Sequence, residues 1–409
     1  MPLAHEMELE SAYVMPTFGR SQVEFASGSG MTLVDSDGRE YLDFLAGIGV
    51  CSLGHAHPAL TAALTGQVER LLHVSNYFYV EHRGEVAEAI SRLVNRESPE
   101  AEQGTWKTFF ANSGAEANEC AMKLARLWSR RFGNGGNTIV CLTGGFHGRT
   151  LETVAATMQE RLQKDFRPLP EGFVAVEPND VDGLEAVFGS LGDEICAVMV
   201  EPIQGESGVH PLTDEYMRAV RDITRSHGAL MICDEVQCGI FRSGKPFAFQ
   251  LSGAVPDIFS MAKGIAGGFP MGACAARAEI ADAFRPGDHG TTFGGGPVAC
   301  AAAEAVLGEL EAGAYDKRAA EVYRGLLRRG LIDADHAMGG VVFYGVTQAG
   351  IDFVDDYAAV QAAEESTKKA QWAHDWKVAA FGAVSGGMLG LVSGALSSEL
   401  VAFLKSLAL

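Results

Sequence analysis

The stretch ICDEVQCGIFRSG at residues 232–244, followed by DIFSMAKG at 257–264, decides the fold of this chain. Asp234 follows the apolar run ALMIC, and Lys263 follows a second short apolar run that ends at Ala262. Short apolar runs bounded by polar and glycine residues predict buried strands of a parallel sheet. Ligands of such sheets bind outside the carboxyl ends of the strands, so we expect this carboxylate and this amine to face one site.

A buried carboxylate and a buried amine at two strand ends suit a cofactor that carries a pyridine ring and an aldehyde. The amine of Lys263 can form a Schiff base with the aldehyde and can also move protons as a base. The carboxylate of Asp234 can keep the ring nitrogen protonated, which makes the ring an electron sink. The pair therefore predicts pyridoxal 5'-phosphate. The alternative, a loop carboxylate and a surface lysine, is weakened by the apolar run before each residue.

Strand-like and helix-like patterns alternate from about residue 60 to residue 300. This alternation predicts an α/β fold with a mostly parallel sheet that is covered by helices on both faces. Strands are expected at 105–111, 138–142, 173–177, 197–202, 229–233, 257–262 and 271–276, and helices at 115–132, 214–227 and 297–312.

A candidate phosphate site lies where the segment FFANSGAEAN passes from a strand into a helix, at Ser113, Gly114 and Ala115. The free N–H groups and the dipole at a helix start attract an anion, and glycine lets the backbone approach it closely. The alternative is a plain N-cap serine, because ordinary caps have the same sequence pattern.

Further side chains near these strand ends complete a candidate cofactor site. Phe146 in GGFHGRT can stack on a pyridine ring, and Val236 can pack on its other face. Gln237 can reach the ring hydroxyl. We expect Glu235, between Asp234 and Val236, to contact the cofactor as well. Arg149 is a candidate clamp for a substrate carboxylate. The alternatives are a core phenylalanine and a solvated arginine.

Composition narrows the classes of partner. A net charge of −20 argues against nucleic acid and anionic membranes as partners. Eight scattered cysteines without a CxxC pair indicate reduced core thiols in a cytoplasmic protein, and the acidic N-terminus lacks a secretory h-region. His55 and His57 without a third ligand do not predict a metal site. The absence of GxGxxG and Walker motifs argues against nicotinamide and ATP chemistry.

Over residues 12–330 the chain resembles the class III aminotransferases, which depend on pyridoxal phosphate and have fold type I. The resemblance rests on stretches such as YLDFLAGIGVCSLGHAHP, FFANSGAEANECAMKLAR, VMVEPIQGESGVHP, LMICDEVQCGIFRSGKPFAF and HGTTFGGGPVACAAA. The GFHGRT form is typical of the acetylornithine branch. It implies exchange of an amino group between N2-acetylornithine and 2-oxoglutarate, in arginine biosynthesis. Succinylornithine, ornithine and 4-aminobutyrate are the alternative amino donors.

The resemblance also implies roles for single residues. Lys263 would carry the cofactor, and Thr292 would reach the phosphate bound by a neighbouring subunit, so the sites would be shared within a homodimer. Arg149 and Thr291 would contact the substrate. The implied domains are a small one formed from the chain termini, with segments 1–60 and 301–409, and a large cofactor-binding one, 61–300.

The tail after about residue 330 departs from the family, whose members carry there a second arginine that binds substrate carboxylate. No arginine follows Arg329, so Glu206, which resembles the glutamate that pairs with that arginine, is expected to lack a partner and to have a raised pKa. Three interpretations follow: a lysine such as Lys368, Lys369 or Lys377 replaces the arginine, the protein binds cofactor but turns over poorly, or the 3′ end of the coding sequence was altered so that the tail is not a product of selection. The uncharged segment 378–398 has a glycine stripe that favours helix packing over membrane association.

Overall fold

The computed structural model describes residues 3–314, 332–337 and 340–346. The chain divides into two compact units, Met1–Arg318 and Ala319–Leu409. The described part of the second unit is an antiparallel pair of strands, β13 (Ile332–Ala337) and β14 (Gly340–Val346). The domain boundaries expected at residues 60 and 300 stay a prediction.

The first unit is built around a sheet to which seven of the described strands belong, in the order β4-β12-β11-β10-β7-β5-β6. Most neighbours are parallel, and β12 runs antiparallel to both β11 and β4. Each expected strand is present within two residues at either end, which confirms the α/β prediction. The strands are β4 (Trp106–Ala111), β5 (Thr138–Leu142), β6 (Phe173–Val176), β7 (Ile195–Val200), β10 (Leu230–Asp234), β11 (Ile258–Met261) and β12 (Gly272–Arg277).

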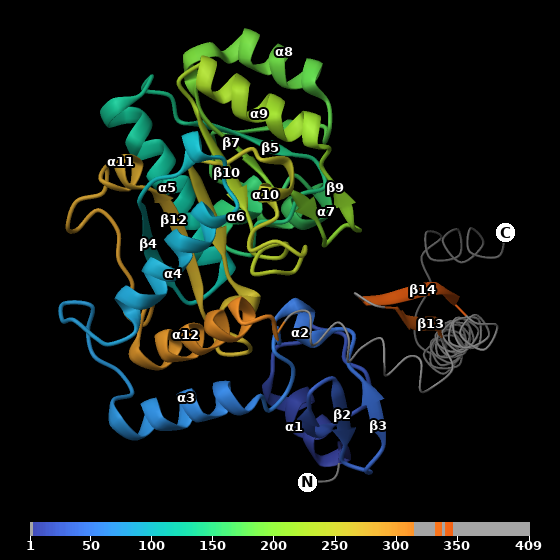
Figure 1. Cartoon of the computed structure of the whole chain (residues 1–409). Helices are drawn as coiled ribbons and strands as arrows, with labels where there is room; N and C mark the ends of the chain where they lie inside the picture. Colours follow the sequence, from blue (N-terminus) through green and yellow to red (C-terminus); the bar gives the residue numbers. More distant parts are fainter. Residues whose placement is uncertain (1–2, 315–331, 338–339, 347–409) are drawn as a thin grey trace, which may run out of the picture. The chain divides into compact units, whose positions relative to one another are not determined.

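Both faces of the sheet are covered because successive strand residues point to opposite sides. Ile139 and Cys141 of β5 pack in one apolar cluster, with residues of α5 (Gly114–Phe132). Val140 and Leu142 of the same strand pack in another cluster, with residues of α4 (Arg83–Arg96), α8 (Val181–Leu191), α9 (Asp214–Ser226) and α12 (Pro297–Glu311). In Figure 1, α8 and α9 lie side by side beyond β5, β7 and β10.

The remaining described elements frame this sheet. Strands β1 (Phe25–Ser29), β2 (Thr32–Asp35) and β3 (Glu40–Leu42) form an antiparallel sheet near the N-terminus. Helix α3 (Pro58–Arg70) lies along α12 (Figure 1). The others are α1 (Leu3–Tyr13), α2 (Ala46–Gly49), α6 (Leu151–Ala156), α7 (Glu160–Gln163), β8 (Ile203–Gln204), β9 (His210–Pro211), α10 (Phe249–Ser252) and α11 (Ala278–Ala281).

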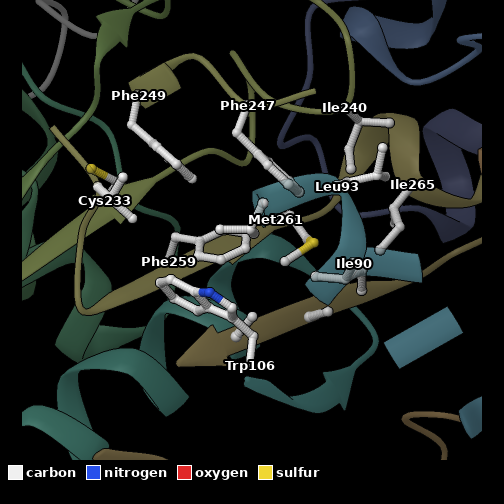
Figure 2. Close-up of a cluster of buried hydrophobic side chains, with 14 of the residues drawn as sticks. Ile90, Leu93, Trp106, Cys233, Ile240, Phe247, Phe249, Phe259, Met261 and Ile265 are labelled. Atoms are coloured by element: carbon white, nitrogen blue, oxygen red, sulfur yellow. The ribbon is translucent and has the colours of Figure 1, made fainter. Parts of the chain in front are cut away.

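An aromatic cluster supports the strand that leads to Lys263. Figure 2 shows the ring of Phe259, on β11, close to those of Trp106 and Phe247. The ring centroids of Phe259 lie 4.7 Å from Phe247, 5.4 Å from Trp106 and 5.5 Å from Phe249. Edge-on aromatic packing of this kind is specific in geometry as well as apolar. The cluster therefore fixes β11 close to where it delivers its last residues to the site.

Candidate functional site

Asp234 is the last residue of β10, and both oxygens of its buried carboxylate are hydrogen-bonded. Strands β10 and β11 pair in parallel with Asp234 opposite Ser260, so both strands end at the same edge of the sheet. One carboxylate oxygen of Asp234, Oδ2, accepts a hydrogen bond from Asn118 Nδ2 at 2.7 Å and lies 2.8 Å from His147 Nδ1. The other accepts bonds from the Val236 N–H at 3.0 Å and the Ser260 hydroxyl at 3.3 Å. These bonds fix the direction in which Asp234 presents its charge.

Lys263 follows β11 and begins a short 3₁₀ turn, Lys263–Ala266. Its φ of 44° lies in the left-handed region, which costs free energy for a residue with a side chain. Its amine has no hydrogen bond or ion pair with any residue that the structure describes. Burial lowers the pKa of this amine, although the negative charges of Asp234 and Glu201 oppose the shift. The structure thus holds a half-buried amine whose neutral form is easier to reach than that of a surface lysine.

The residues around these two side chains enclose a cavity of about 410 Å³. Its volume is within the usual range for small-molecule sites. Of the predicted site residues, those that line it are Ser113, Gly114, Ala115, Phe146, Glu206, Asp234, Val236, Gln237 and Lys263. The structure therefore brings together segments that are more than a hundred residues apart in the chain.

The start of α5 forms one end of the cavity. The Ser113 hydroxyl accepts a hydrogen bond from the Glu116 N–H at 3.2 Å, so this serine is an ordinary N-cap as well as a lining residue. A Cβ on Gly114 would lie 2.7 Å from Cγ1 of Val236. Only a glycine lets the helix start and the Val236 loop come this close. Together they leave free N–H groups of the first helical turn beside the cavity, as an anion requires.

The turn that carries Phe146 is held by a buried carboxylate. The Phe146 N–H donates to Glu201 Oε1 at 2.7 Å, and Glu201 also lines the cavity. Burial raises the pKa of Glu201 to about 7, against the opposing charge of His147. The Phe146 ring in turn contacts the Arg149 guanidinium, whose carbon lies 5.3 Å from the ring centre.

Glu235 is a predicted cofactor contact that the structure places outside the cavity lining. Its carboxylate oxygens accept hydrogen bonds from the N–H groups of Ala248 and Phe249, both at 2.8 Å. It does not line the cavity, because its position next to Asp234 on an extended strand end turns its side chain the other way. Glu235 holds the loop that supplies Phe247 and Phe249 to the aromatic cluster, and we no longer expect it to contact a cofactor.

The predicted lack of a partner for Glu206 is wrong. Nη2 of Arg161, on α7, lies 2.9 Å and 3.0 Å from the two Glu206 oxygens, and Gln159 donates to one of them at 3.2 Å. Burial opposes ionisation of Glu206, but the bond from Arg161 outweighs it, so its pKa is lowered rather than raised. The sequence reasoning missed this arginine because it searched only the tail.

The two threonines of the segment HGTTF lie outside the cavity lining. The Thr291 hydroxyl accepts a bond from Asn112 Nδ2 at 3.3 Å, and Asn112 itself lines the cavity. Thr292 is exposed. Arg149 is also exposed and does not line the cavity, although the ring that it covers does.

Sequence reasoning also missed four buried residues of the site: Asn118, His147, Glu201 and Ser260. Glu201 in VMVEP and Ser260 in IFSMA could have been found, because each is a polar residue in an otherwise apolar run. Nε2 of His55 and Oδ2 of Asp43 share a hydrogen bond of 2.6 Å. In the described ranges no cluster of three or more acidic, histidine or cysteine side chains is arranged to hold a metal ion.

Lys368, Lys369, Lys377 and the segment 378–398 lie outside the described residues. No helix in the part of the chain that is described combines the length and the apolar character needed to cross a membrane.

The cavity fits a phosphorylated pyridine aldehyde. Gly114 gives an anion close access to a helix start, and Phe146 and Val236 are apolar lining groups for a flat ring. Asp234 is a fixed anion for a protonated ring nitrogen, and Lys263 is an amine for an aldehyde. The residues present therefore match the phosphate, the ring, the ring nitrogen and the aldehyde of pyridoxal 5'-phosphate.

Comparisons with known proteins agree with this fit. The family model described as "Aminotransferase class-III" matches residues 17–369. The acetylornithine aminotransferase of Caldanaerobacter subterraneus is 47% identical over 302 residues, 74% of each chain. That of Methanocaldococcus jannaschii is 42% identical over 324 residues, 79% of this chain and 78% of the other. A structure of Toxoplasma gondii ornithine aminotransferase, with partial occupancy of PLP, superposes with a TM-score of 0.71 and 30% identity, covering 81% of this chain and 79% of that one.

Family, fold and cavity lead to one conclusion. The matched region contains the whole cavity, and the structural neighbours have the same α/β architecture. The chain belongs to the class III aminotransferases, enzymes that depend on pyridoxal 5'-phosphate.

Proposed function

We propose that this enzyme transfers the terminal amino group of N2-acetylornithine to 2-oxoglutarate, as a step of arginine biosynthesis. The observation that carries the proposal is the convergence of Asp234, Lys263 and the start of α5 on one cavity. The choice of donor rests on relatives named acetylornithine aminotransferase, at 42–47% identity. Ornithine, succinylornithine and 4-aminobutyrate are the competing donors, and ornithine aminotransferases are among the structural neighbours.

The cofactor-binding roles follow from the position of each side chain. Ser113, Gly114 and Ala115 would hold the phosphate, and Phe146 and Val236 would enclose the ring. Gln237 lines the same cavity and would reach the ring hydroxyl. When bound, pyridoxal phosphate supplies an aldehyde that condenses with amines and a ring that accepts electrons.

Two side chains of the protein would hold or transfer protons during the reaction. Asp234 would hold the proton on the ring nitrogen, because its four hydrogen bonds keep a carboxylate fixed there. Lys263 would act as the base that takes a proton from the substrate carbon that bears the amine and delivers it to the carbon of the cofactor aldehyde. Its lowered pKa favours the neutral amine that this role needs. Arg149 would bind the carboxylate that donor and acceptor share.

We also propose a homodimer with shared sites and a cytoplasmic location. Thr292 is exposed, and so is its large apolar neighbour Phe293. Asn76 donates a hydrogen bond to the Thr291 carbonyl, and the two residues that follow Asn76, Tyr77 and Phe78, are exposed as well. An apolar surface around a residue implied in phosphate binding supports a second subunit at this place. Eight free cysteines support a reducing compartment.

A two-step spectroscopic experiment tests the proposal. Purified protein should show the visible absorption of bound cofactor, and the Lys263→Ala variant should lose the band that depends on the lysine. Acetylornithine alone should bleach this band, and 2-oxoglutarate should restore it. If ornithine bleaches the band faster than acetylornithine at equal concentration, the proposed donor is wrong. If acetylornithine bleaches the band but 2-oxoglutarate does not restore it, the protein binds cofactor but turns over poorly.

A further inference from the structure

Glu206, at the rim of the cavity, is paired with the exposed Arg161, which is not itself a lining residue. This pair is suited to exchange partners. Arg161 uses a single nitrogen, Nη2, for both contacts to Glu206. Its Nη1 and Nε donate to none of the residues that the structure describes. A guanidinium has five N–H donors in a fixed fork, so this side chain retains the capacity to grip another carboxylate with two bonds.

The two partners differ in how freely they move. The Arg161 side chain is 60% exposed and stands on the four-residue helix α7, whereas the Glu206 side chain is 29% exposed and lines the cavity. Gln159 donates to Glu206 at 3.2 Å and to the Gly145 carbonyl at 2.8 Å, which ties Glu206 to the turn before Phe146. Ion pairs this exposed contribute little net free energy, so Arg161 can leave its partner at small cost.

The two substrates of the proposed reaction differ in the number of carboxylates that the rim must bind. Acetylornithine has one free carboxylate, and 2-oxoglutarate has two. Arg149, in contact with the Phe146 ring, is placed for the carboxylate that both possess. The second carboxylate of 2-oxoglutarate would meet the charge of Glu206 unless a cation came with it. Arg161 is already in contact with that charge.

We propose that Arg161 determines specificity for acidic substrates, by exchanging Glu206 for the second carboxylate of a dicarboxylate. With a donor that has one carboxylate, Arg161 stays on Glu206 and keeps the rim neutral at this point. With a dicarboxylate, the guanidinium moves to the substrate, and Glu206 keeps its bond to Gln159. The inference rests on the proposed function, and it places the second carboxylate-binding group within residues 159–206 rather than in the tail.

The test compares Arg161→Gln with Arg167→Gln in separate half-reactions of the holoenzyme. Arg167 is the matched control because it also forms an exposed ion pair close by in the chain, but its partner, Glu160, does not line the cavity as Glu206 does. Arg161→Gln should raise the apparent Kd for 2-oxoglutarate at least about tenfold, the loss expected for a charged hydrogen bond. Its apparent Kd for acetylornithine should stay within about twofold of wild type, as for other exposed pairs.

Further variants separate direct contact from simple neutralisation. Arg161→Lys should recover part of the loss, because the charge remains. If Arg161 acted only by neutralising Glu206, the double variant Arg161→Gln/Glu206→Gln would bind 2-oxoglutarate as tightly as Glu206→Gln alone, and the proposal would be overturned. A 2-oxo acid with one carboxylate should react equally with wild type and Arg161→Gln. Equal melting temperatures of the two single arginine variants exclude misfolding as the cause.

The outcomes also keep this inference apart from the proposed function. If acetylornithine leaves the wild-type spectrum unchanged but another donor works, the donor is wrong, and the arginine comparison is run with that donor. If wild type completes both half-reactions and Arg161→Gln behaves as Arg167→Gln does, the proposed function stands and the role of Arg161 is refuted.

Discussion

Nδ1 of His147 lies 2.8 Å from Oδ2 of Asp234, and both side chains are buried. Burial works against a charged imidazole, but the hydrogen bond to Asp234 outweighs it and raises the pKa of His147 above its usual 6.5. The imidazole behind the carboxylate that would face the ring nitrogen therefore keeps its proton to a higher pH than a free imidazole does. The orientation of this carboxylate depends on a residue in the loop that carries Phe146.

Replacing His147 by asparagine should make stability less dependent on pH. The asparagine amide would keep a neutral donor near the position of Nδ1 but could not bind a proton. Because the folded pKa of His147 is raised, the charged ring stabilises the fold fully below pH 6.5, and this contribution is lost as the pH rises through the folded value. The melting temperature of wild type should exceed that of His147→Asn most at about pH 6 or below, and the gap should narrow on going to about pH 9. A constant gap would contradict the charged pair.

Gly114→Ala should weaken cofactor binding while leaving most of the fold intact. The new methyl group would lie 2.7 Å from Val236 Cγ1, so the helix start or the Val236 loop must shift. We expect the Kd for pyridoxal phosphate, titrated into cofactor-stripped protein, to rise by about tenfold or more, because overpacking costs about 1–3 kcal/mol.

Two further variants control this experiment. Gly189→Ala adds the same methyl group within α8, where nothing lies within 4 Å, and should not change the Kd. Gly114→Ala/Val236→Ala should regain much of the affinity, because it restores the space. Unchanged binding by Gly114→Ala would show that close packing here does not shape the phosphate end of the site.

Glu201→Gln should stabilise the protein at alkaline pH. The pKa of Glu201 in the folded state is about 7, above its usual 4.5, so the folded protein holds this proton more tightly than the unfolded chain. Wild type should therefore lose about 2–3 kcal/mol of stability relative to Glu201→Gln as the pH rises from 4.5 to about 7. Glutamine keeps an acceptor for the Phe146 N–H. Denaturant unfolding at several pH values measures the difference, and exposed Glu185→Gln serves as the control.

Mixing two inactive variants should restore activity if subunits share sites. Lys263→Ala removes the cofactor amine from its own subunit, and Thr292→Asp would place a negative charge at the phosphate of the neighbouring one. A hybrid dimer of the two has one site with both residues intact, so refolded mixtures should regain about a quarter of wild-type activity. A mixture of Lys263→Ala with Lys263→Ala/Thr292→Asp should regain none. Hybrids that form but stay inactive would refute sharing.

The sequence was informative where local pattern and chemistry coincide. The runs before Asp234 and Lys263 are short, apolar and bounded by turns, so strands ending at those residues could be predicted, and β10 and β11 do pair side by side. The N-cap at Ser113 was equally visible, because capping is a local property.

The contacts that connect the site were not predictable from pattern. His147 and Asp234 are 87 positions apart, and Arg161 and Glu206 are 45 apart. Such pairs depend on the order of strands in the sheet and on loop paths, which a local pattern does not specify. Glu235 was counted among the cofactor contacts because it neighbours Asp234 in the chain, although neighbouring residues of an extended strand point to opposite sides.

Adjacent carboxylates at the end of β10 serve opposite sides of the protein. Asp234 faces the cavity, while Glu235 binds the backbone that carries Phe247 and Phe249. A slip of one residue in the register of β10 would turn Asp234 away from the cavity and put Cys233 or Glu235 in its place, depending on the direction of the slip. The fidelity with which this strand finds its register during folding thus decides whether a molecule can become an enzyme at all.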